Sequence, residues 1–162
     1  MPVRRLLAPD APAFREIRLE GLRDYPDAFG ASMREEAALP LASFEQNLDR
    51  GFVLGGDMPD GQLGGVAGLR FNETDRTRHK AWLWGMYVRP PSRGTGLAAS
   101  LITGIVDEAR GKVEEVVLTV GDHNAAAIAR YRSMGFEACG VEHRALKVGE
   151  IYVNDLMMSF RF

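Results

Sequence analysis

The chain has 162 residues, of which 46% are hydrophobic and 26% charged, and its net charge is −2 at pH 7. These values are ordinary for a soluble globular protein, and we expect a single domain over residues 1–162. The small net charge excludes a general affinity for nucleic acid or for an anionic membrane surface. Cys139 is the one cysteine, so no disulfide can form within the chain, and its small apolar neighbours predict a buried structural thiol.

The sequence also lacks the segments that direct a protein to a membrane. No run approaches the ~20 apolar residues that a spanning helix needs. The N-terminus has no apolar export segment, and the lone cysteine fits a reducing compartment. We therefore expect a cytoplasmic protein with no membrane partner and no metal cofactor.

The first fifty residues predict a strand followed by helices. Residues 1–7 alternate as a short strand does, and apolar spacing over residues 11–24 is typical of an amphipathic helix. Ser32 and Glu35 form the S-x-x-E pattern of a capping box, which predicts a short helix from Ser32. A further helix is expected over residues 43–50.

Residues 25–36, which we call the covering segment, allow two interpretations. Pro26 breaks the preceding helix. In the functional interpretation, the segment covers a substrate, and Tyr25, Phe29, Glu35 and Glu36 face a pocket. In the other, it is a helical hairpin whose carboxylates are solvated.

Three strands are predicted next. Residues 51–56 and 62–71 read as a hairpin, because the sequence between them is rich in the turn residues Asp, Pro and Gly. Residues 79–88 form an apolar and aromatic strand. Gly85 lies inside it, and glycine within a strand marks a bulge or a close approach of the backbone.

A glycine-rich turn joins this strand to a helix. Residues 88–98 read V-R-P-P-S-R-G-T-G-L-A, and apolar residues recur at helical spacing from Leu97 until Gly111 ends the pattern. The unpaired amides at the start of such a helix, with the positive end of its dipole, favour a phosphate or pyrophosphate. The sequence G-T-G-L-A-A also fits a dinucleotide fingerprint, but five residues separate it from the strand, and too little chain follows for a second half-sheet.

The last third predicts one buried strand, one helix and a final hairpin. Residues 115–120 are almost continuously apolar, so a parallel pair with residues 79–88 and a right-handed crossover is expected. Asn124 is a good N-cap for a helix over residues 125–134. Two strands follow, over residues 136–146 and 151–160.

Two of these stretches, taken together, resemble the GNAT superfamily of N-acetyltransferases. The loop pattern is Arg93, Gly96 and Ala98, and the second motif is Asn124, then Tyr131, then Gly-Phe opening a strand. The resemblance implies a mixed α/β (α+β) fold. Its central twisted sheet would be mostly antiparallel, with six to seven strands and one parallel pair, and about four helices would flank it.

The resemblance also implies roles for individual residues, with acetyl-CoA as the cosubstrate. Backbone groups of residues 86–88 would pair with the pantetheine arm, and Asn124 would bond the same region. Amides of the loop would bind the pyrophosphate beside Arg93, and Tyr131 would protonate the departing sulfur. The expected cofactor-binding residues are Met86, Tyr87, Val88, Arg93, Gly94, Thr95, Gly96, Leu97, Ala98, Ala99, Asn124 and Tyr131.

The general base is not identified by this resemblance. Some members of the superfamily carry a glutamate five positions before the motif's asparagine, where this chain has Thr119. A lysine-like amine with a pKa of ~10.4 is almost wholly protonated at pH 7, so a base is needed. The open candidates are a water chain and the side chains of Glu35, Glu36, His79, Asp122 and His123.

The expected function is therefore transfer of an acetyl group to a primary amine of a small molecule or peptide. The alternative is a non-catalytic acyl-CoA-binding module, which the absent carboxylate favours and which Asn124 and Tyr131 disfavour. Residues 156–158, Phe160 and Phe162 are apolar. They fit either the core or a homodimer interface, and the sequence does not decide between the two.

Overall fold

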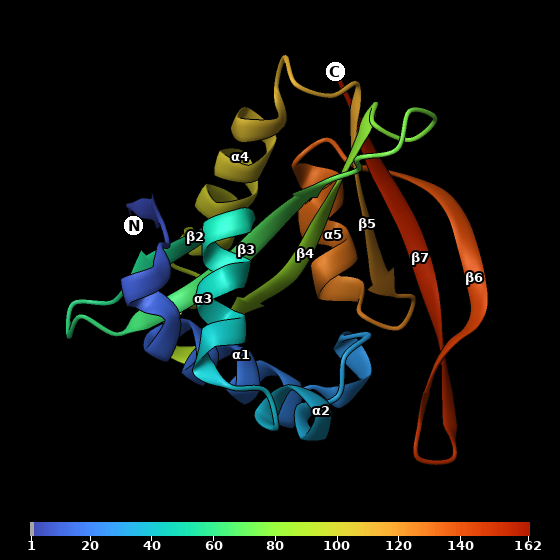
Figure 1. The fold of residues 1–162 in the computed structure, drawn as a ribbon. Coiled ribbons are helices and arrows are strands. Elements are labelled where there is room, and N and C mark those ends of the chain that lie inside the picture. The colour runs from blue at the N-terminus through green and yellow to red at the C-terminus, as the bar shows by residue number, and fades with distance from the viewer. Residues whose placement is uncertain (1) are drawn as a thin grey trace.

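A computed structural model describes residues 2–162, and its seven strands form one sheet in the order β1-β2-β3-β4-β5-β7-β6 (Figure 1). The strands are β1 (Val3–Arg5), β2 (Phe52–Asp57), β3 (Leu63–Phe71), β4 (Lys80–Val88), β5 (Glu115–Gly121), β6 (Glu137–Val148) and β7 (Ile151–Arg161). The α-helices within residues 2–162 are α1 (Ala11–Asp24), α2 (Met33–Ala37), α3 (Leu41–Arg50), α4 (Leu97–Ala109) and α5 (Ala125–Ser133). Short 3-10 turns occupy Ala8–Asp10, Pro26–Ala28 and Pro90–Ser92.

One neighbouring pair of strands is parallel, and it is short. β4 and β5 are in register only from Lys80 opposite Glu115 to Trp82 opposite Val117, although both strands continue beyond this ladder. The other neighbours pair antiparallel. The predicted fold class is confirmed, and beyond Trp82 the two central strands separate.

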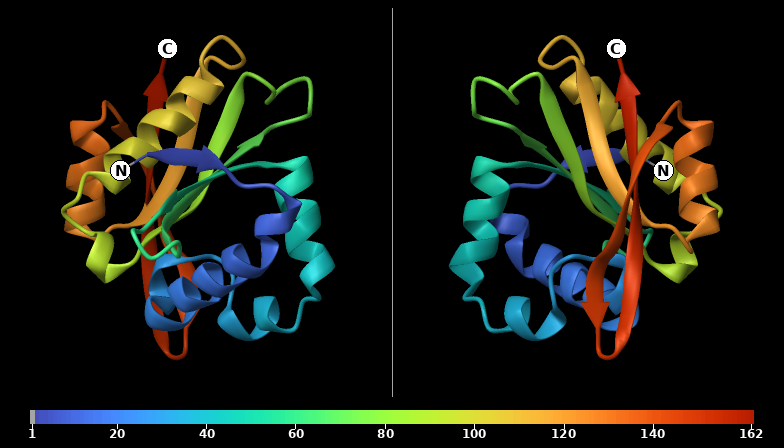
Figure 2. Two further views of the ribbon diagram at one scale, coloured as in Figure 1. Left: turned by 90° about the vertical axis from the view of Figure 1, so that its left-hand side faces the viewer. Right: turned by 90° about the vertical axis from the view of Figure 1, so that its right-hand side faces the viewer.

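Helices cover both faces of the sheet (Figure 2). On one face α4 and α5 pack over the larger core, and Leu97, Leu101, Ile102 and Ile105 are fully buried there. Their spacing places them on one stripe of α4, and each buried aliphatic side chain stabilises the fold by about 1.5–3 kcal/mol. On the other face α1 and α3 cover a second core.

Gly85 lies in a bulge of β4, as its place within a strand predicts. Val66 pairs with Tyr87 and Gly68 pairs with Trp84, so two residues of β4 lie opposite one of β3. Gly85 has φ of 63°, a conformation that glycine adopts without strain. The bulge redirects β4 just before Met86, close to where β4 and β5 separate.

The end of β4 is fixed to α1 by a buried arginine. Arg89 donates to Glu20 (2.9 Å) and Glu16 (2.9 Å) and to the carbonyl of Leu63 (3.0 Å). The hydroxyl of Tyr87 donates to the same Glu20 at 3.1 Å. This network anchors the strand end immediately before the glycine loop.

The predicted caps are confirmed, and one predicted burial is wrong. Ser32 accepts from the amide of Glu35, and Asn124 accepts from that of Ala127. Cys139 is exposed rather than buried. It lies in the edge strand β6, whose residues 137–144 are all exposed, where the β6–β7 register shifts between Ala138 and Gly140.

The last strand contributes mainly to the core. Met158 is fully buried, and Leu156 and Phe160 pack against the larger core, while Phe162 is 44% exposed. Several boundaries also differ from the sequence prediction: β1 covers only Val3–Arg5, α3 begins at Leu41, and β6 continues to Val148.

Candidate active site

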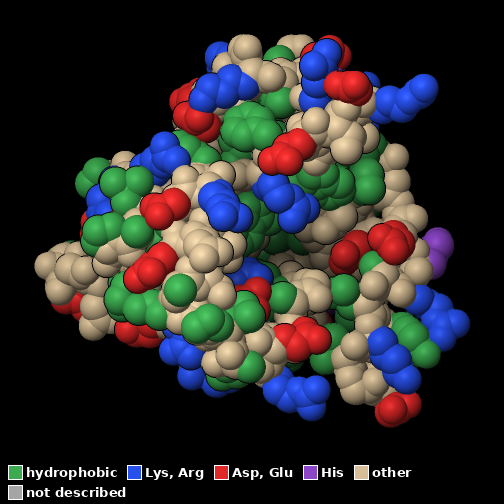
Figure 3. Space-filling view, viewed as in Figure 1, with side chains coloured by type: hydrophobic (Ala, Val, Ile, Leu, Met, Phe, Trp, Pro, Cys, Tyr) green, Lys and Arg blue, Asp and Glu red, His purple; other side chains and the backbone are tan. Residues whose placement is uncertain are grey.

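Two adjacent cavities open where β4 and β5 separate. The larger has a volume of about 510 Å³ and the smaller about 140 Å³. A hollow is visible on this face, above the covering segment and beside β4 (Figure 3). The cavities share six lining residues, which come from the covering segment, β4 and α5: Ala28, Phe29, Met86, Asn124, Ala127 and Tyr131.

The glycine loop forms one end of the larger cavity. Gly94 and Gly96 both have positive φ, at 76° and 88°, and Gly96 is the N-cap of α4. Ser100 is the first residue whose amide reaches back to the Gly96 carbonyl. The amides of residues 97–99 are therefore left for a ligand, in the geometry that binds phosphate.

Most of the residues expected to bind a cofactor line this larger cavity. Those that do are Met86, Tyr87, Val88, Arg93, Gly94, Gly96, Ala98, Ala99, Asn124 and Tyr131. Leu97 and Thr95 do not. The Leu97 side chain is fully buried in the core, and the Thr95 hydroxyl donates to the Ser92 carbonyl at 2.7 Å. Only backbone atoms of Leu97 are left to face a ligand.

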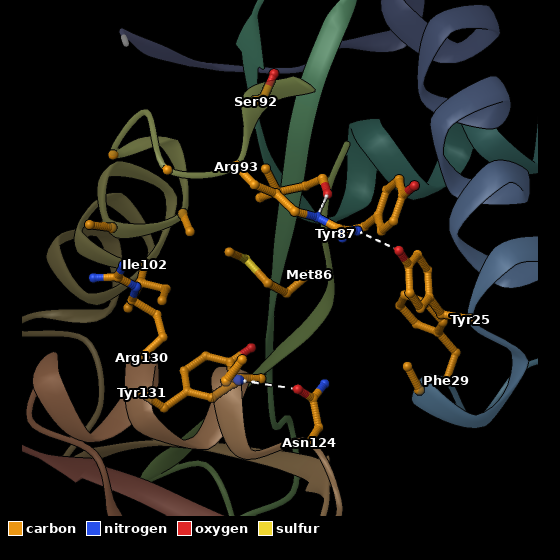
Figure 4. Close-up of a pocket in the computed structure, with 18 residues that line it drawn as sticks. Tyr25, Phe29, Met86, Tyr87, Ser92, Arg93, Ile102, Asn124, Arg130 and Tyr131 are labelled. Atoms are coloured by element: carbon orange, nitrogen blue, oxygen red, sulfur yellow. Dashed lines mark hydrogen bonds between the residues drawn. The ribbon is translucent and has the colours of Figure 1, made fainter. Parts of the chain in front are cut away.

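Arg93 extends across the cavity rather than along the loop (Figure 4). Its guanidinium donates to the carbonyl of Val88 (3.1 Å) and to the hydroxyl of Tyr25 (2.9 Å). It also lies 5.1 Å from the centre of the Tyr25 ring. The side chain thereby links the glycine loop to the covering segment.

Tyr131 stands where the two cavities meet, and its ring points toward Met86 (Figure 4). The ring is buried and contacts Phe136 edge-on, with 5.7 Å between the ring centres. Within residues 2–162 its hydroxyl makes no hydrogen bond. Burial raises the pKa of this hydroxyl above the ordinary tyrosine value, so the group stays protonated.

The smaller cavity contains one of the five candidate bases. His123 lines it, together with Thr119, Trp84 and Tyr131. The other four candidates do not line either cavity, and each contacts another side chain. Glu36 forms a two-point ion pair with Arg18, and Glu35 accepts a hydrogen bond from the hydroxyl of Ser32. Asp122 accepts a hydrogen bond from Asn154, and His79 lies beside Glu115 at the far end of β4.

The covering segment therefore combines the two interpretations. Tyr25 and Phe29 line the larger cavity, as the functional interpretation predicts. Glu35 and Glu36 line neither cavity. Glu36 is not a solvated carboxylate either, because its ion pair with Arg18 is mostly buried.

Sequence reasoning missed six residues that line the larger cavity: Ala28, Ser92, Ile102, Ala126, Ala127 and Arg130. Arg130 lies four residues after Ala126 and next to Tyr131 on α5, so helical spacing could have identified this face. Arg130 adds a second positive charge at the cavity.

Other kinds of site receive no support from the described residues. Within residues 2–162, no three His, Cys, Asp or Glu side chains gather in a way that could hold a metal ion. No helix in the same range is both long and apolar enough to cross a membrane.

Comparisons with known proteins identify the family. The acetyltransferase (GNAT) family profile matches residues 13–136. The N-alpha-acetyltransferase RimI of Mycobacterium tuberculosis is 37% identical over 89 residues, which are 54% of each chain, so the match spans about half the length of that relative. The ribosomal-protein-alanine N-acetyltransferase of Brucella melitensis has a TM-score of 0.82 at 25% identity, over 100% of both chains.

A further solved structure shares the fold. The phosphinothricin acetyltransferase of Sinorhizobium meliloti, in complex with acetyl-CoA, has a TM-score of 0.82 at 20% identity, over 99% of this chain and 88% of that one. The family profile covers most of the present chain, including both the glycine loop and the Asn124–Tyr131 motif. The protein therefore belongs to the acetyltransferase (GNAT) family.

Proposed function

We propose that this protein is an acetyl-CoA-dependent N-acetyltransferase whose acceptor is the α-amino group of a peptide chain. The observation that carries the proposal is the pair of cavities that meet at Tyr131. Acetyl-CoA occupies the larger cavity, and the acceptor amine enters through the smaller one. We also take residues 1–162 as one domain, because strands from both ends of the chain belong to the same sheet.

The larger cavity suits each part of the cosubstrate. The free amides at the start of α4 bind the pyrophosphate, and Arg93 and Arg130 supply positive charge nearby. The pantetheine arm lies along residues 86–88 like an added strand, because β5 has already separated from β4 there. Its thioester then reaches Met86 and Tyr131, at the junction of the cavities.

The reaction at that junction needs three groups. The acceptor must be a neutral amine, a backbone amide of residues 86–88 must polarise the thioester carbonyl, and the departing sulfur must gain a proton. Tyr131 is suited to the last task, because its raised pKa keeps the hydroxyl protonated. A thiolate, with a pKa near the ~8.5 of cysteine, is a tolerable leaving group, so this donor adds a modest acceleration.

The acceptor class rests on the relatives. RimI of M. tuberculosis is an N-alpha-acetyltransferase, and the B. melitensis protein is a ribosomal-protein-alanine N-acetyltransferase. An α-amine also makes a smaller demand on the enzyme, since its pKa of ~7.7–8.0 leaves part of it neutral at pH 7. The smaller cavity, at about 140 Å³, accommodates little more than a small first residue.

The proposal is tested by thiol release from acetyl-CoA in the presence of a short peptide that begins with alanine. The matched control is the same peptide with a formyl group on its α-amine. We expect thiol release with the free peptide only, and an added acetyl group on its first residue by mass spectrometry. Binding of acetyl-CoA without release in either case would contradict the assignment of a peptide α-amine as the acceptor.

Arg93 and Tyr25 are expected to affect coenzyme A binding in opposite directions. Arg93→Ala removes a charge beside the pyrophosphate and should weaken CoA binding more than binding of a phosphate-free pantetheine analogue. Tyr25→Phe frees Arg93 from one hydrogen bond, typically worth about 1 kcal/mol, so CoA binding should strengthen up to about fivefold. Calorimetric titration measures both, and equal losses for CoA and pantetheine in Arg93→Ala would exclude the phosphate contact.

The raised pKa of Tyr131 predicts the alkaline side of the pH profile. A pKa raised above the ordinary 10.0 means that the donor loses its proton only above pH 10. We therefore expect no decline of kcat from this group between about pH 8 and pH 10. Initial rates, corrected for uncatalysed thioester hydrolysis, provide the measurement. A decline in that range that Tyr131→Phe abolishes would show that the hydroxyl ionises earlier.

A further inference from the structure

The lining of the two cavities narrows the search for the missing base. Within residues 2–162, the titratable side chains that line either cavity are Tyr25, Tyr87, Arg93, Arg130, Tyr131 and His123. Tyrosine and arginine have ordinary pKa values of ~10 and above, so neither accepts a proton near neutral pH. Imidazole does, and His123 lines the cavity that we assign to the acceptor.

His123 is held in place by a glycine and by a carboxylate. Its ring lies against Gly121, where an added Cβ would come within 2.7 Å of the imidazole Cε1 and 3.0 Å of Nδ1. Its Nε2 lies 3.0 Å from Oδ2 of Asp27. Asp27 belongs to the 3-10 turn of the covering segment, next to Ala28 and Phe29, which line both cavities.

We infer that His123 removes the proton from the acceptor amine and that Asp27 is its positioning residue, an inference that rests on the function proposed above. With the ring hydrogen on Nε2, the nitrogen that lies 3.0 Å from Oδ2 of Asp27, Nδ1 is the basic nitrogen. This pair supplies the base that Thr119, which lines the same cavity, cannot provide.

The protons balance as follows. The acceptor ammonium transfers one proton to Nδ1 of His123, and the neutral amine forms the C–N bond to the thioester carbonyl carbon. The C–S bond then breaks, and the sulfur takes the proton of the Tyr131 hydroxyl. The second proton lost by the new amide nitrogen returns to Tyr131 through solvent. His123 releases its proton to solvent, so one proton is produced in each turnover.

Two carboxylates act on the imidazole. Asp27 is in direct contact with it, and Asp155 of β7 interacts with it electrostatically, although burial and then Glu142 and Asp122 raise the pKa of Asp155. Asp27 and Asp155 stabilise the imidazolium that forms once the proton has been taken. The cation on the α1 side, Arg18, is neutralised by its ion pair with Glu36. Asp155 itself lines neither cavity, so it is not the base.

The covering segment is linked to the inferred base. Because Asp27 lies beside residues that line both cavities, the covering segment both lines the site and contacts its base.

The test compares His123→Gln with the parent on the alanine peptide, at about pH 6.5 and about pH 9.5, on either side of the α-amine pKa of ~7.7–8.0. We expect kcat/KM to fall about a hundredfold at the lower pH and only a few-fold at the higher, where the acceptor is already neutral. Asp27→Asn should likewise lose more kcat/KM at the lower pH than at the higher, although its loss should be smaller than that of His123→Gln. The reason is that the asparagine amide donates to Nε2 and moves the ring proton to Nδ1. His143→Gln, an exposed histidine of β6 that lines neither cavity, is the matched control.

The outcomes separate this inference from the proposed function. A parent protein that releases no more thiol with the free peptide than with the formylated one refutes the proposed function. An active parent whose His123→Gln variant loses the same factor at both pH values, or nothing at either, overturns the assignment of His123. If His123→Gln loses kcat/KM mainly at the lower pH but Asp27→Asn has the kinetics of the parent, the role of Asp27 is overturned.

Discussion

Replacing Glu20 by alanine is expected to destabilise the protein by about 3 kcal/mol, because it leaves a buried arginine without its main partner. The side chain of Arg89 is 9% exposed, and Glu20 is 22% exposed and bonds both Arg89 and the hydroxyl of Tyr87. Without Glu20, the buried guanidinium keeps only the mostly exposed Glu16 as an ionic partner in a region of low polarity.

Urea unfolding of four variants, Glu20→Ala, Glu16→Ala, Arg89→Met and the double variant of Glu20 and Arg89, measures this effect. Glu16→Ala is the matched control, because Glu16 pairs with the same arginine but is 69% exposed, and we expect it to lose less than about 1 kcal/mol. In a protein that already carries Arg89→Met, Glu20→Ala should lower the free energy of unfolding much less, since the buried guanidinium is no longer present. Equal and small losses for Glu16→Ala and Glu20→Ala would show that the network does not anchor the end of β4.

Tyr131→Phe is expected to lower kcat about a hundredfold while acetyl-CoA affinity hardly changes. The substitution keeps the ring and its edge-on contact with Phe136, and removes only a hydroxyl that has no hydrogen-bond partner within residues 2–162. General acid catalysis contributes about 10²–10⁴-fold, and the low end is expected because a thiolate leaves fairly well unaided.

Tyr87→Phe is the matched control for this prediction. Tyr87 lines the larger cavity too, but its hydroxyl bonds Glu20, and burial followed by that contact raises its pKa to about 12. We expect its removal to cost about 1 kcal/mol of stability and to leave kcat within a few-fold of the parent. If Tyr131→Phe turns over like the parent, Tyr131 is a packing residue, and water protonates the sulfur.

Local pattern was sufficient to predict most of the fold. The stripe of Leu97, Leu101 and Ile105 defines α4, and Gly85 marks the bulge, because helical spacing and glycine conformation are properties of short stretches. The glycine loop was likewise predicted from its letters. Cys139 was misjudged, since its exposure depends on the place of β6 at the edge of the sheet, where residues 137–144 are all exposed, and composition does not reveal that place.

The chemistry of the candidate site was less predictable, because it depends on contacts between distant parts of the chain. Glu36 looked like a candidate base in the sequence, but it is neutralised by Arg18 of another helix. The pairing of His123 with Asp27 joins a turn after β5 to a turn after α1, and no local pattern links the two. The junction of the cavities exists only because the β4–β5 ladder ends at Trp82.

The central claim, that two substrates meet at Tyr131, is tested most directly with a bisubstrate conjugate. In this compound the sulfur of coenzyme A is joined through an acetyl bridge to the α-nitrogen of an alanine peptide. If the two cavities are continuous, joining the two ligands should give a Kd at least about a hundredfold below that of coenzyme A alone, through effective concentration. Two results together would contradict the account. The conjugate would bind no more tightly than coenzyme A, and a protease would cleave its peptide part as fast in the presence of the protein as in free solution.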